Sequence, residues 1–349
     1  MIKNINEITP IPDRPLVTVA LFAYNQEKYI REAVQSAFAQ TYEPLEIILS
    51  DDCSTDRTFE IISELVSAYD GTHRTVLNRT DHNIGTIDHV VTVARKSRGQ
   101  LIVPMAGDDI SDSNRVEEIV NRWLGSKACV VQSHFREINA EGELITNNLG
   151  EMVSTTIQKW FRNCDILRPN NGIYPALIGP TAAYERQFLA DIPLNNRKCL
   201  NEDALTTILC ILNKHKIETI NLELLSHRRH YGNVSSDQNA STMQELKQNE
   251  LSLVRFSHST VNFIDFVHET IQGEVKTGKP VYWLKVAENM MAGKELYSLH
   301  ANIWDMTALE RIHALIRSKK REQFLFILPR VFGFGFFIGL KRALILFKS

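Results

Sequence analysis

The most constraining feature of this chain is an alternation of short apolar runs with amphipathic segments between residues 16 and 105. The run Leu16–Phe22 is apolar and β-branched, which is typical of a buried strand. It precedes Tyr29–Gln40, where apolar residues recur at the three-to-four spacing of an amphipathic helix. Because parallel strands need a crossover connection, this alternation predicts an α/β fold with a mostly parallel central sheet and helices on both faces.

The alternation continues along the chain and then changes character. Further strands are predicted at residues 45–50, 74–77, 101–105 and 128–132, and helices at 57–69, 86–96, 115–124 and 203–212. From Met243 onward the apolar residues follow helical periodicity over long stretches. We therefore predict an α/β domain over residues 1–235 and a helical region over residues 236–349.

Charge and cysteine content exclude several classes of protein. The chain has 39 Lys and Arg against 41 Asp and Glu, so it lacks the excess of cations that a nucleic-acid partner requires. Its 5 cysteines are scattered, with no C-x-x-C pair to indicate a zinc or redox site. The N-terminus has no apolar run of signal-peptide length, and we expect a cytoplasmic protein.

The C-terminal tail carries two interpretations. Residues Phe324–Leu340 are almost wholly apolar, but Pro329, Arg330 and three glycines interrupt them, so they are too short and broken to predict a membrane span. Residues Lys341–Lys348 then place cations beside further apolar side chains. The tail is either a helix packed on the protein or an interfacial helix on the anionic inner leaflet of a membrane.

Polar loops follow three of the predicted strands: Ala23-Tyr24-Asn25, Asp51-Asp52 and Gly107-Asp108-Asp109. Ligands of open α/β sheets bind at the carboxyl ends of the strands, so these loops are the candidate site. Neither a P-loop nor a G-x-G-x-x-G after the first strand is present, which argues against a P-loop kinase and a Rossmann dehydrogenase. A bound diphosphate would instead need a divalent cation held by carboxylates, which the adjacent Asp108 and Asp109 could supply. The alternative for an Asp pair in a loop is a helix cap or a solvated turn.

Several motifs in order along the chain resemble one known family. They are residues 17–30, 33–42 and 45–56, then Asn83-Ile-Gly85, Gly107-Asp108-Asp109, Glu202-Asp203 and 227–235. Together they are similar to the inverting nucleotide-sugar glycosyltransferases of family 2, which have the GT-A fold. The resemblance implies a nucleoside diphosphate sugar donor, UDP being the expected nucleotide, and a saccharide acceptor.

The resemblance also implies roles for individual residues. Four residues of the first loop would contact the nucleoside: Ala23, Tyr24, Asn25 and Glu27. Asp52 would read the base. The Asp-x-Asp element of the family is altered here, because Ala106 stands where its first acid is usual. Asp108 is therefore assigned to the ribose or the metal, and Asp109 to the metal, expected to be Mn²⁺ or Mg²⁺.

The catalytic base implied by the resemblance is Asp203, with Glu202 as the alternative. An inverting transfer needs one carboxylate to accept the proton of the acceptor hydroxyl. Without the resemblance, Asp203 reads as an ordinary acid at a helix start. His227 and His230 are three residues apart, which would suit a metal pair on a helix or be incidental. In similar enzymes this segment covers the diphosphate, which assigns His230 to the metal and Arg229 to the nucleotide.

Two functional hypotheses follow from these residues. The first is an inverting glycosyltransferase whose acceptor, given the apolar and cationic tail, is a lipid-linked oligosaccharide used in cell-surface polysaccharide synthesis. The second is a non-catalytic binding or membrane-docking module that keeps the nucleotide-sugar fold, suggested by Ala106 and by the helical C-terminal third. The sugar and linkage depend on the variable segment between residues 133 and 200.

Overall fold

The structure is a computed structural model that describes residues 14–148, 177–230, 243–276, 278, 282–302 and 306–307. The N-terminal half contains β1 (Val17–Ala23), α1 (Ile30–Phe38), β2 (Leu45–Asp51), α2 (Thr58–Ala68), β3 (Arg74–Arg79), α3 (Thr86–Lys96), β4 (Leu101–Ala106), β5 (Ile110–Ser111), α4 (Arg115–Ser126), β6 (Val130–Ile138) and β7 (Leu144–Asn148). The remainder contains the 3₁₀ turn η2 (Gly179–Thr181), β8 (Ala182–Glu185), α6 (Arg186–Ala190), α7 (Glu202–Asn213), β9 (Ile217–Arg228), α8 (Met243–Lys276) and α9 (Tyr282–Asn302).

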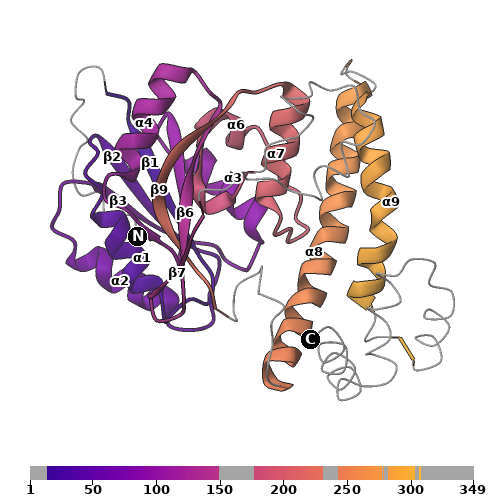
Figure 1. The fold of residues 1–349 in the computed structure, drawn as a ribbon, viewed down its shortest axis with the longest axis horizontal. Coiled ribbons are helices and arrows are strands. Elements are labelled where there is room, and N and C mark those ends of the chain that lie inside the picture. The colour runs from indigo at the N-terminus through magenta and orange to yellow at the C-terminus, as the bar shows by residue number, and fades with distance from the viewer. Residues whose placement is uncertain are drawn as a thin grey trace, which may run out of the picture.

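One sheet organises the chain, with strand order β3-β2-β1-β4-β8-β6-β9-β5 and β7 paired to β6 (Figure 1). Strands β3, β2, β1 and β4 run parallel to one another. Beyond β4 the sheet is mixed, because β8 runs antiparallel to both β4 and β6 while β9 is parallel to β6. The parallel half is thus the one that carries the three polar loops.

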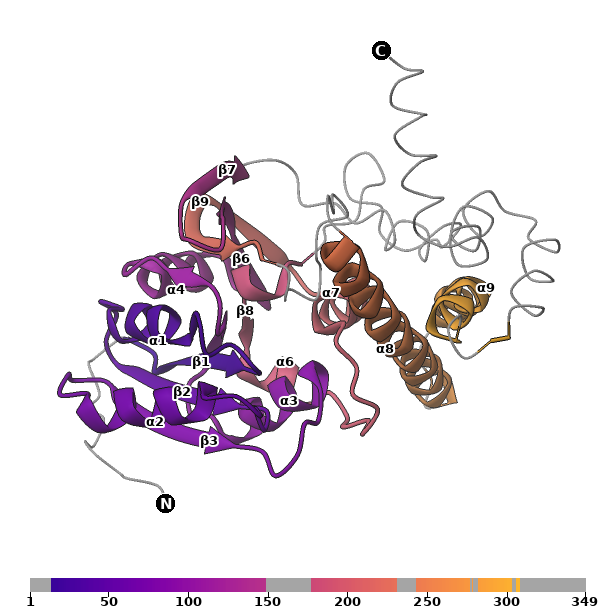
Figure 2. The same ribbon diagram turned by 90° about the horizontal axis from the view of Figure 1, so that it is seen from below.

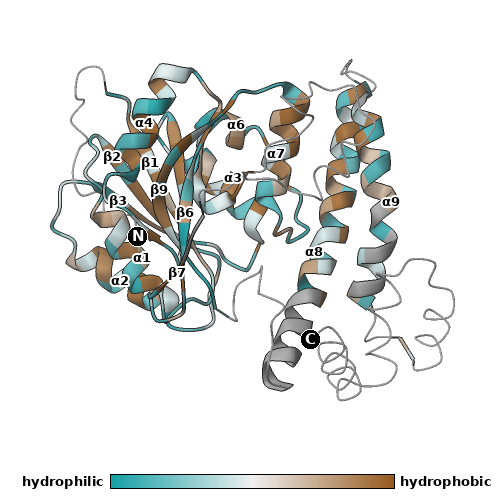
Figure 3. Ribbon diagram, in the orientation of Figure 1, coloured by the Kyte–Doolittle hydropathy of each residue, from teal (hydrophilic) through white to brown (hydrophobic). Residues whose placement is uncertain are grey.

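Helices cover both faces of this sheet, as the alternating pattern predicts. In β1, Val19 and Leu21 pack into a hydrophobic cluster with α1, α2 and α4, whereas Ala20 packs into a second cluster with α3 and α7. Strand side chains alternate between faces, and each face here has its own layer of helices. Figure 3 shows the central strands coloured predominantly hydrophobic, as expected for strands buried on both sides. The predicted α/β architecture, with a central sheet covered by helices on both faces, is confirmed.

The helical C-terminal region is also confirmed. Helices α8 and α9 lie side by side as a long pair, and α7 lies between α8 and the sheet (Figures 1 and 2). Phe263 and Ile264 of α8 are fully buried in the same cluster as Ile87 of α3 and Ile208 of α7. This region therefore shares a core with the α/β unit. The proposed boundary at residue 235 and the tail at 324–349 lie outside the described residues.

Some strands were not predicted. Strand β9 spans 12 residues, yet its buried and exposed positions do not alternate regularly, so it carries no period-two signal. β5 has only 2 residues and is held by pairing with β9. Within the part of the chain that the structure describes, no helix is both long and apolar enough to cross a bilayer.

Candidate functional site

The three polar loops are brought together by strand register. Ala23 at the end of β1 is paired with Asp51 of β2, and Phe22 is paired with Ala106 of β4. Backbone hydrogen bonds continue past the strands: the Asp52 amide donates to the Ala23 carbonyl at 2.9 Å. The loops after β1, β2 and β4 therefore begin side by side at one edge of the sheet.

The loop after β1 is tied to the start of α2 by the side chains of Asn25 and Glu27. Asn25 has φ of 53°, and its side-chain oxygen accepts the Thr55 amide at 2.8 Å. The Glu27 carboxylate accepts the Arg57 amide at 3.1 Å. Tyr24 is also exposed, at 44%, and no side-chain hydrogen bond ties it to α2 among the described residues. Asn25 and Glu27 thus shape the loop, while Tyr24 offers a surface.

Asp52 orders the loop that follows β3. Its buried carboxylate accepts hydrogen bonds from the hydroxyl of Thr80 at 2.9 Å and from the amides of Ile84 and Gly85 at 3.0 Å each. Gly85 has φ of +83°, and a Cβ there would lie 2.5 Å from the Cα of Lys198. Asp52 therefore fixes the turn that contacts the segment before α7.

Asp108 and Asp109 each lie against a histidine. Asp109 is fully buried and accepts the Arg228 amide at 2.9 Å and Nδ1 of His227 at 3.1 Å. Burial raises the pKa of Asp109. Burial lowers the pKa of His227, but the hydrogen bond and charge of Asp109 outweigh it and give a net rise. Nε2 of His230 lies 3.0 Å from the Asp108 carboxylate. The interpretation of these histidines as a helical pair is wrong, because β9 ends between them and extended backbone carries His227.

Arg228 is a buried residue of this site that the sequence analysis did not single out. Its guanidinium donates to the backbone carbonyls of Asp108 and Ala140 at 3.0 Å each, and it forms an ion pair with Glu32 of α1. It also lies 5.0 Å from the centroid of the Tyr29 ring. Arg228 thus connects the loop that carries Asp108 and Asp109 to α1 and to the turn between β6 and β7. Its neighbour Arg229, predicted to contact the nucleotide, forms an ion pair with Glu137.

The donor groups around Asp108 and Asp109 suit a divalent cation in kind. Carboxylate oxygens with an imidazole nitrogen are ligands that Mn²⁺ accepts, and a carboxyl whose charged form burial disfavours is stabilised by a cation. Among the residues that the structure describes, no three His, Cys, Asp or Glu side chains converge into a ready metal site. The described residues thus offer donor atoms of the kind that Mn²⁺ accepts, but no assembled metal site.

Glu202 and Asp203 begin helix α7 and place two partly buried carboxyl groups side by side. Burial and the charge of Asp203 raise the pKa of Glu202 to about 8, and burial also raises the pKa of Asp203. The Asp203 carboxylate accepts the Ala204 amide at 2.7 Å. Gly179 lies against this pair: a Cβ on Gly179 would be 2.2 Å from Oε1 of Glu202. Burial therefore disfavours the charged form of both carboxyl groups.

Contacts link this pair to the other loops. Arg115, fully buried, donates to the carbonyl of Pro104 in β4 at 3.2 Å and to that of Pro180 in η2 at 2.5 Å. On the other side, the amide of Ile87 donates to the carbonyl of Cys199 at 3.1 Å, which joins α3 to the segment before α7. Among the hydrogen bonds and ion pairs of the described residues, none joins Asp203 directly to Asp52 or Asp109. The fold connects them through η2 and the segment 195–201.

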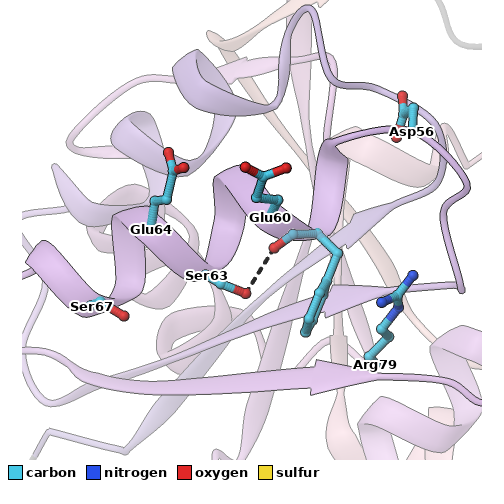
Figure 4. A pocket seen from close by; sticks show the side chains of 7 residues that line it. Asp56, Glu60, Ser63, Glu64, Ser67 and Arg79 are labelled. Atoms are coloured by element: carbon cyan, nitrogen blue, oxygen red, sulfur yellow. Dashed lines mark hydrogen bonds between the residues drawn. The ribbon is translucent and has the colours of Figure 1, made fainter.

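A surface depression lies apart from these acids, along α2. Its lining is Asp56, Phe59, Glu60, Ser63, Glu64, Ser67 and Arg79. Figure 4 shows Glu60, Ser63, Glu64 and Ser67 along the helix and Arg79 beside them. None of the acids predicted for catalysis or metal binding lines it, and we assign it no role in the chemistry.

The geometry agrees with what comparisons find. The profile of the family described as "Glycosyl transferase family 2" matches residues 18–192. The chain is 34% identical over 129 residues to a glycosyltransferase of Haemophilus influenzae, covering 37% of this chain and 39% of that protein. It is 36% identical over 135 residues to the chondroitin synthase of Escherichia coli, covering 38% of this chain and 19% of the synthase. The hyaluronan synthase of Pasteurella multocida is 32% identical over 148 residues, covering 40% of this chain and 15% of that synthase. The chain thus spans well under half the length of each of these relatives.

Two solved structures are also similar. Staphylococcus aureus TarS 1–349 in complex with UDP-GlcNAc aligns with a TM-score of 0.46 and 16% identity, covering 81% of this chain and 91% of that one. The mannosyltransferase PcManGT of Pyrobaculum calidifontis, in complex with GDP-Man and Mn²⁺, aligns with a TM-score of 0.47 and 14% identity, covering 91% and 80%.

Proposed function

The chain belongs to glycosyl transferase family 2, and from that premise we propose that it moves a sugar from a nucleoside diphosphate to a hydroxyl acceptor with inversion at the anomeric carbon. The observation that carries this proposal is the pair of acids at the start of α7, where the Asp203 carboxylate accepts the Ala204 amide at 2.7 Å beside Glu202. A single-displacement transfer needs one ionised carboxylate to accept the proton of the acceptor hydroxyl, and we assign that role to Asp203.

In the proposed reaction Asp203 accepts the proton of the acceptor hydroxyl. The hydroxyl oxygen forms a bond to the anomeric carbon from the face opposite the diphosphate. The bond between that carbon and the diphosphate oxygen breaks, and the electron pair leaves with the nucleoside diphosphate. The raised pKa of Asp203 brings this base closer to the pH at which a proton acceptor works best.

The departing diphosphate is negatively charged, and the loop that carries Asp108 and Asp109 would help to offset that charge. We assign Asp109, Asp108 and His230 to a Mn²⁺ or Mg²⁺ ion. Arg228 holds their loop in place through its hydrogen bond to the backbone carbonyl of Asp108. When bound, such an ion neutralises charge on the departing diphosphate. We assign Tyr24, Asn25, Glu27 and Asp52 to the nucleoside side of the site, because their loops begin at the same sheet edge.

The donor and acceptor are part of the proposal. We propose a UDP-sugar as donor, on the resemblance of the first two loops. Similarity to a chondroitin synthase and a hyaluronan synthase supports a saccharide acceptor in polysaccharide assembly. The cationic, apolar tail supports an acceptor presented at the cytoplasmic face of a membrane, such as a lipid-linked oligosaccharide.

The proposal is tested by Asp203→Asn with Glu202→Gln as matched control. With UDP-sugars and Mn²⁺, wild type should release UDP, and D203N should lose about 10²-fold or more in kcat while UDP binding stays within about twofold. E202Q should lose far less, because glutamine replaces a residue that is already neutral near pH 7. Normal turnover by D203N would contradict the assignment of the base. Absence of turnover by wild type across a broad panel of nucleotide sugars would contradict the function.

A further inference from the structure

Helix α8 is fastened to the segment that leads into the proposed base. Ser259 of α8 is 4% exposed, and its Oγ accepts the amide of Leu200 at 2.7 Å and donates to the side-chain oxygen of Asn201 at 3.0 Å. One turn further along, the side chain of Asn262 donates to the Arg197 carbonyl at 2.9 Å. These hydrogen bonds reach the chain immediately before Glu202.

The opposite side of the same segment is held by α3. The buried carboxylate of Asp88 accepts the amide of Asn195 at 3.0 Å and that of Asn196 at 2.7 Å. Segment 195–201 is thus clamped between α3 and α8, with Ser259 as the contact nearest to α7.

The bond from Ser259 changes what Asn201 does for helix α7. Asn201 occupies the N-cap position, where an Asn side chain normally accepts the amide of the second or third helical residue. Here its oxygen accepts the Ser259 hydroxyl instead, and it makes no cap hydrogen bond. The amide of the third helical residue, Ala204, is left to the Asp203 carboxylate.

We propose that Ser259 is a positioning residue for the transfer reaction: by holding the Asn201 side chain away from the helix, it leaves the Ala204 amide to orient Asp203. The proposal rests on the proposed function, in which Asp203 is the base. It gives helix α8 a role in the chemistry through the residues that lead into α7.

The decisive variants are Ser259→Ala and the double variant Ser259→Ala with Asn201→Ala. Without the hydroxyl, Asn201 is free to cap α7 and compete with Asp203 for the Ala204 amide. We expect S259A to lower kcat about tenfold with KM for the donor within about twofold, because the nucleotide loops are untouched. S259T, which keeps a hydroxyl, should recover kcat. Removing the competing side chain should make the double variant more active than S259A.

The matched control is Ser257→Ala, two residues earlier on the same helix. Ser257 is fully buried and its hydroxyl has no hydrogen-bond partner in the described part of the chain. It should keep wild-type kcat. Equal kcat in S259A and S257A, a rise in KM alone, or a double variant less active than S259A would each overturn the proposal.

An NMR titration, which needs no turnover, tests the role of Ser259 independently of whether the protein is a transferase. In protein labelled with ¹⁵N-alanine, the Ala204 amide resonance of wild type and of S257A should shift as the pH is varied through the titration of Asp203. The reason is that the Ala204 amide donates a hydrogen bond to the Asp203 carboxylate. In S259A the size of this shift should fall, and in the double variant it should return to the wild-type size. A pH-dependent shift of the Ala204 resonance as large in S259A as in wild type refutes the positioning role, whether or not the protein transfers sugar.

Discussion

Replacing Glu202 by glutamine tests the electrostatics of the pair at the start of α7. The pKa of this carboxyl rises from 4.5 to about 8 in the folded protein, first because of burial and then because of the charge on Asp203. At about 1.4 kcal/mol for each tenfold change in equilibrium, that rise corresponds to roughly 5 kcal/mol. Glu202 is partly exposed and water screens part of this energy, so we expect about 2 kcal/mol.

The sign follows from which state holds the proton. Below pH 4.5 both the folded and the unfolded chain keep Glu202 protonated, and the residue costs folding nothing. Between pH 4.5 and about 8 only the unfolded chain releases the proton, so the folded state loses stability as the pH rises. Glutamine is neutral throughout. E202Q should therefore match wild type near pH 5 and exceed it by about 2 kcal/mol at pH 8.5.

Urea unfolding followed by tryptophan fluorescence at pH 5 and pH 8.5 measures this difference. Comparing variant with wild type at each pH cancels the titration of the other groups. Glu60→Gln on the exposed side of α2 is the control: Arg57 lowers the pKa of Glu60, so E60Q should gain nothing at high pH. The reasoning is refuted if the difference between E202Q and wild type is the same at both pH values.

Two further perturbations probe the loops. Gly85→Ala should destabilise the protein by about 2 kcal/mol or more, because φ of +83° and a Cβ 2.5 Å from the Lys198 backbone both oppose a side chain. Thermal unfolding measures this loss of stability. Gly273→Ala, at a helical position with open space around it, is the control and should show no loss. Asp109→Asn should weaken Mn²⁺-dependent binding of UDP at least about tenfold by calorimetry, since an amide cannot offset the charge of a cation; unchanged affinity would remove Asp109 from the metal site.

Local patterns predicted the parallel half of the sheet well. The strand over residues 101–105 and the helix over residues 86–96 each carry their own periodicity, and both are observed close to the predicted bounds. The three polar loops were predicted to meet for the same reason, because parallel strands in register end at one edge.

The sequence by itself determined the elements of the parallel half of the sheet, their order and the acids that follow those strands, because side-chain periodicity and turn residues act between near neighbours. Only the tertiary structure placed His227 against Asp109, 118 residues apart, and Ser259 against Asn201, 58 residues apart. A hydrogen bond between segments so distant leaves no periodic trace in either one. Its geometry is fixed by how β9 enters the sheet and how α8 packs on α7, which depends on the whole core at once.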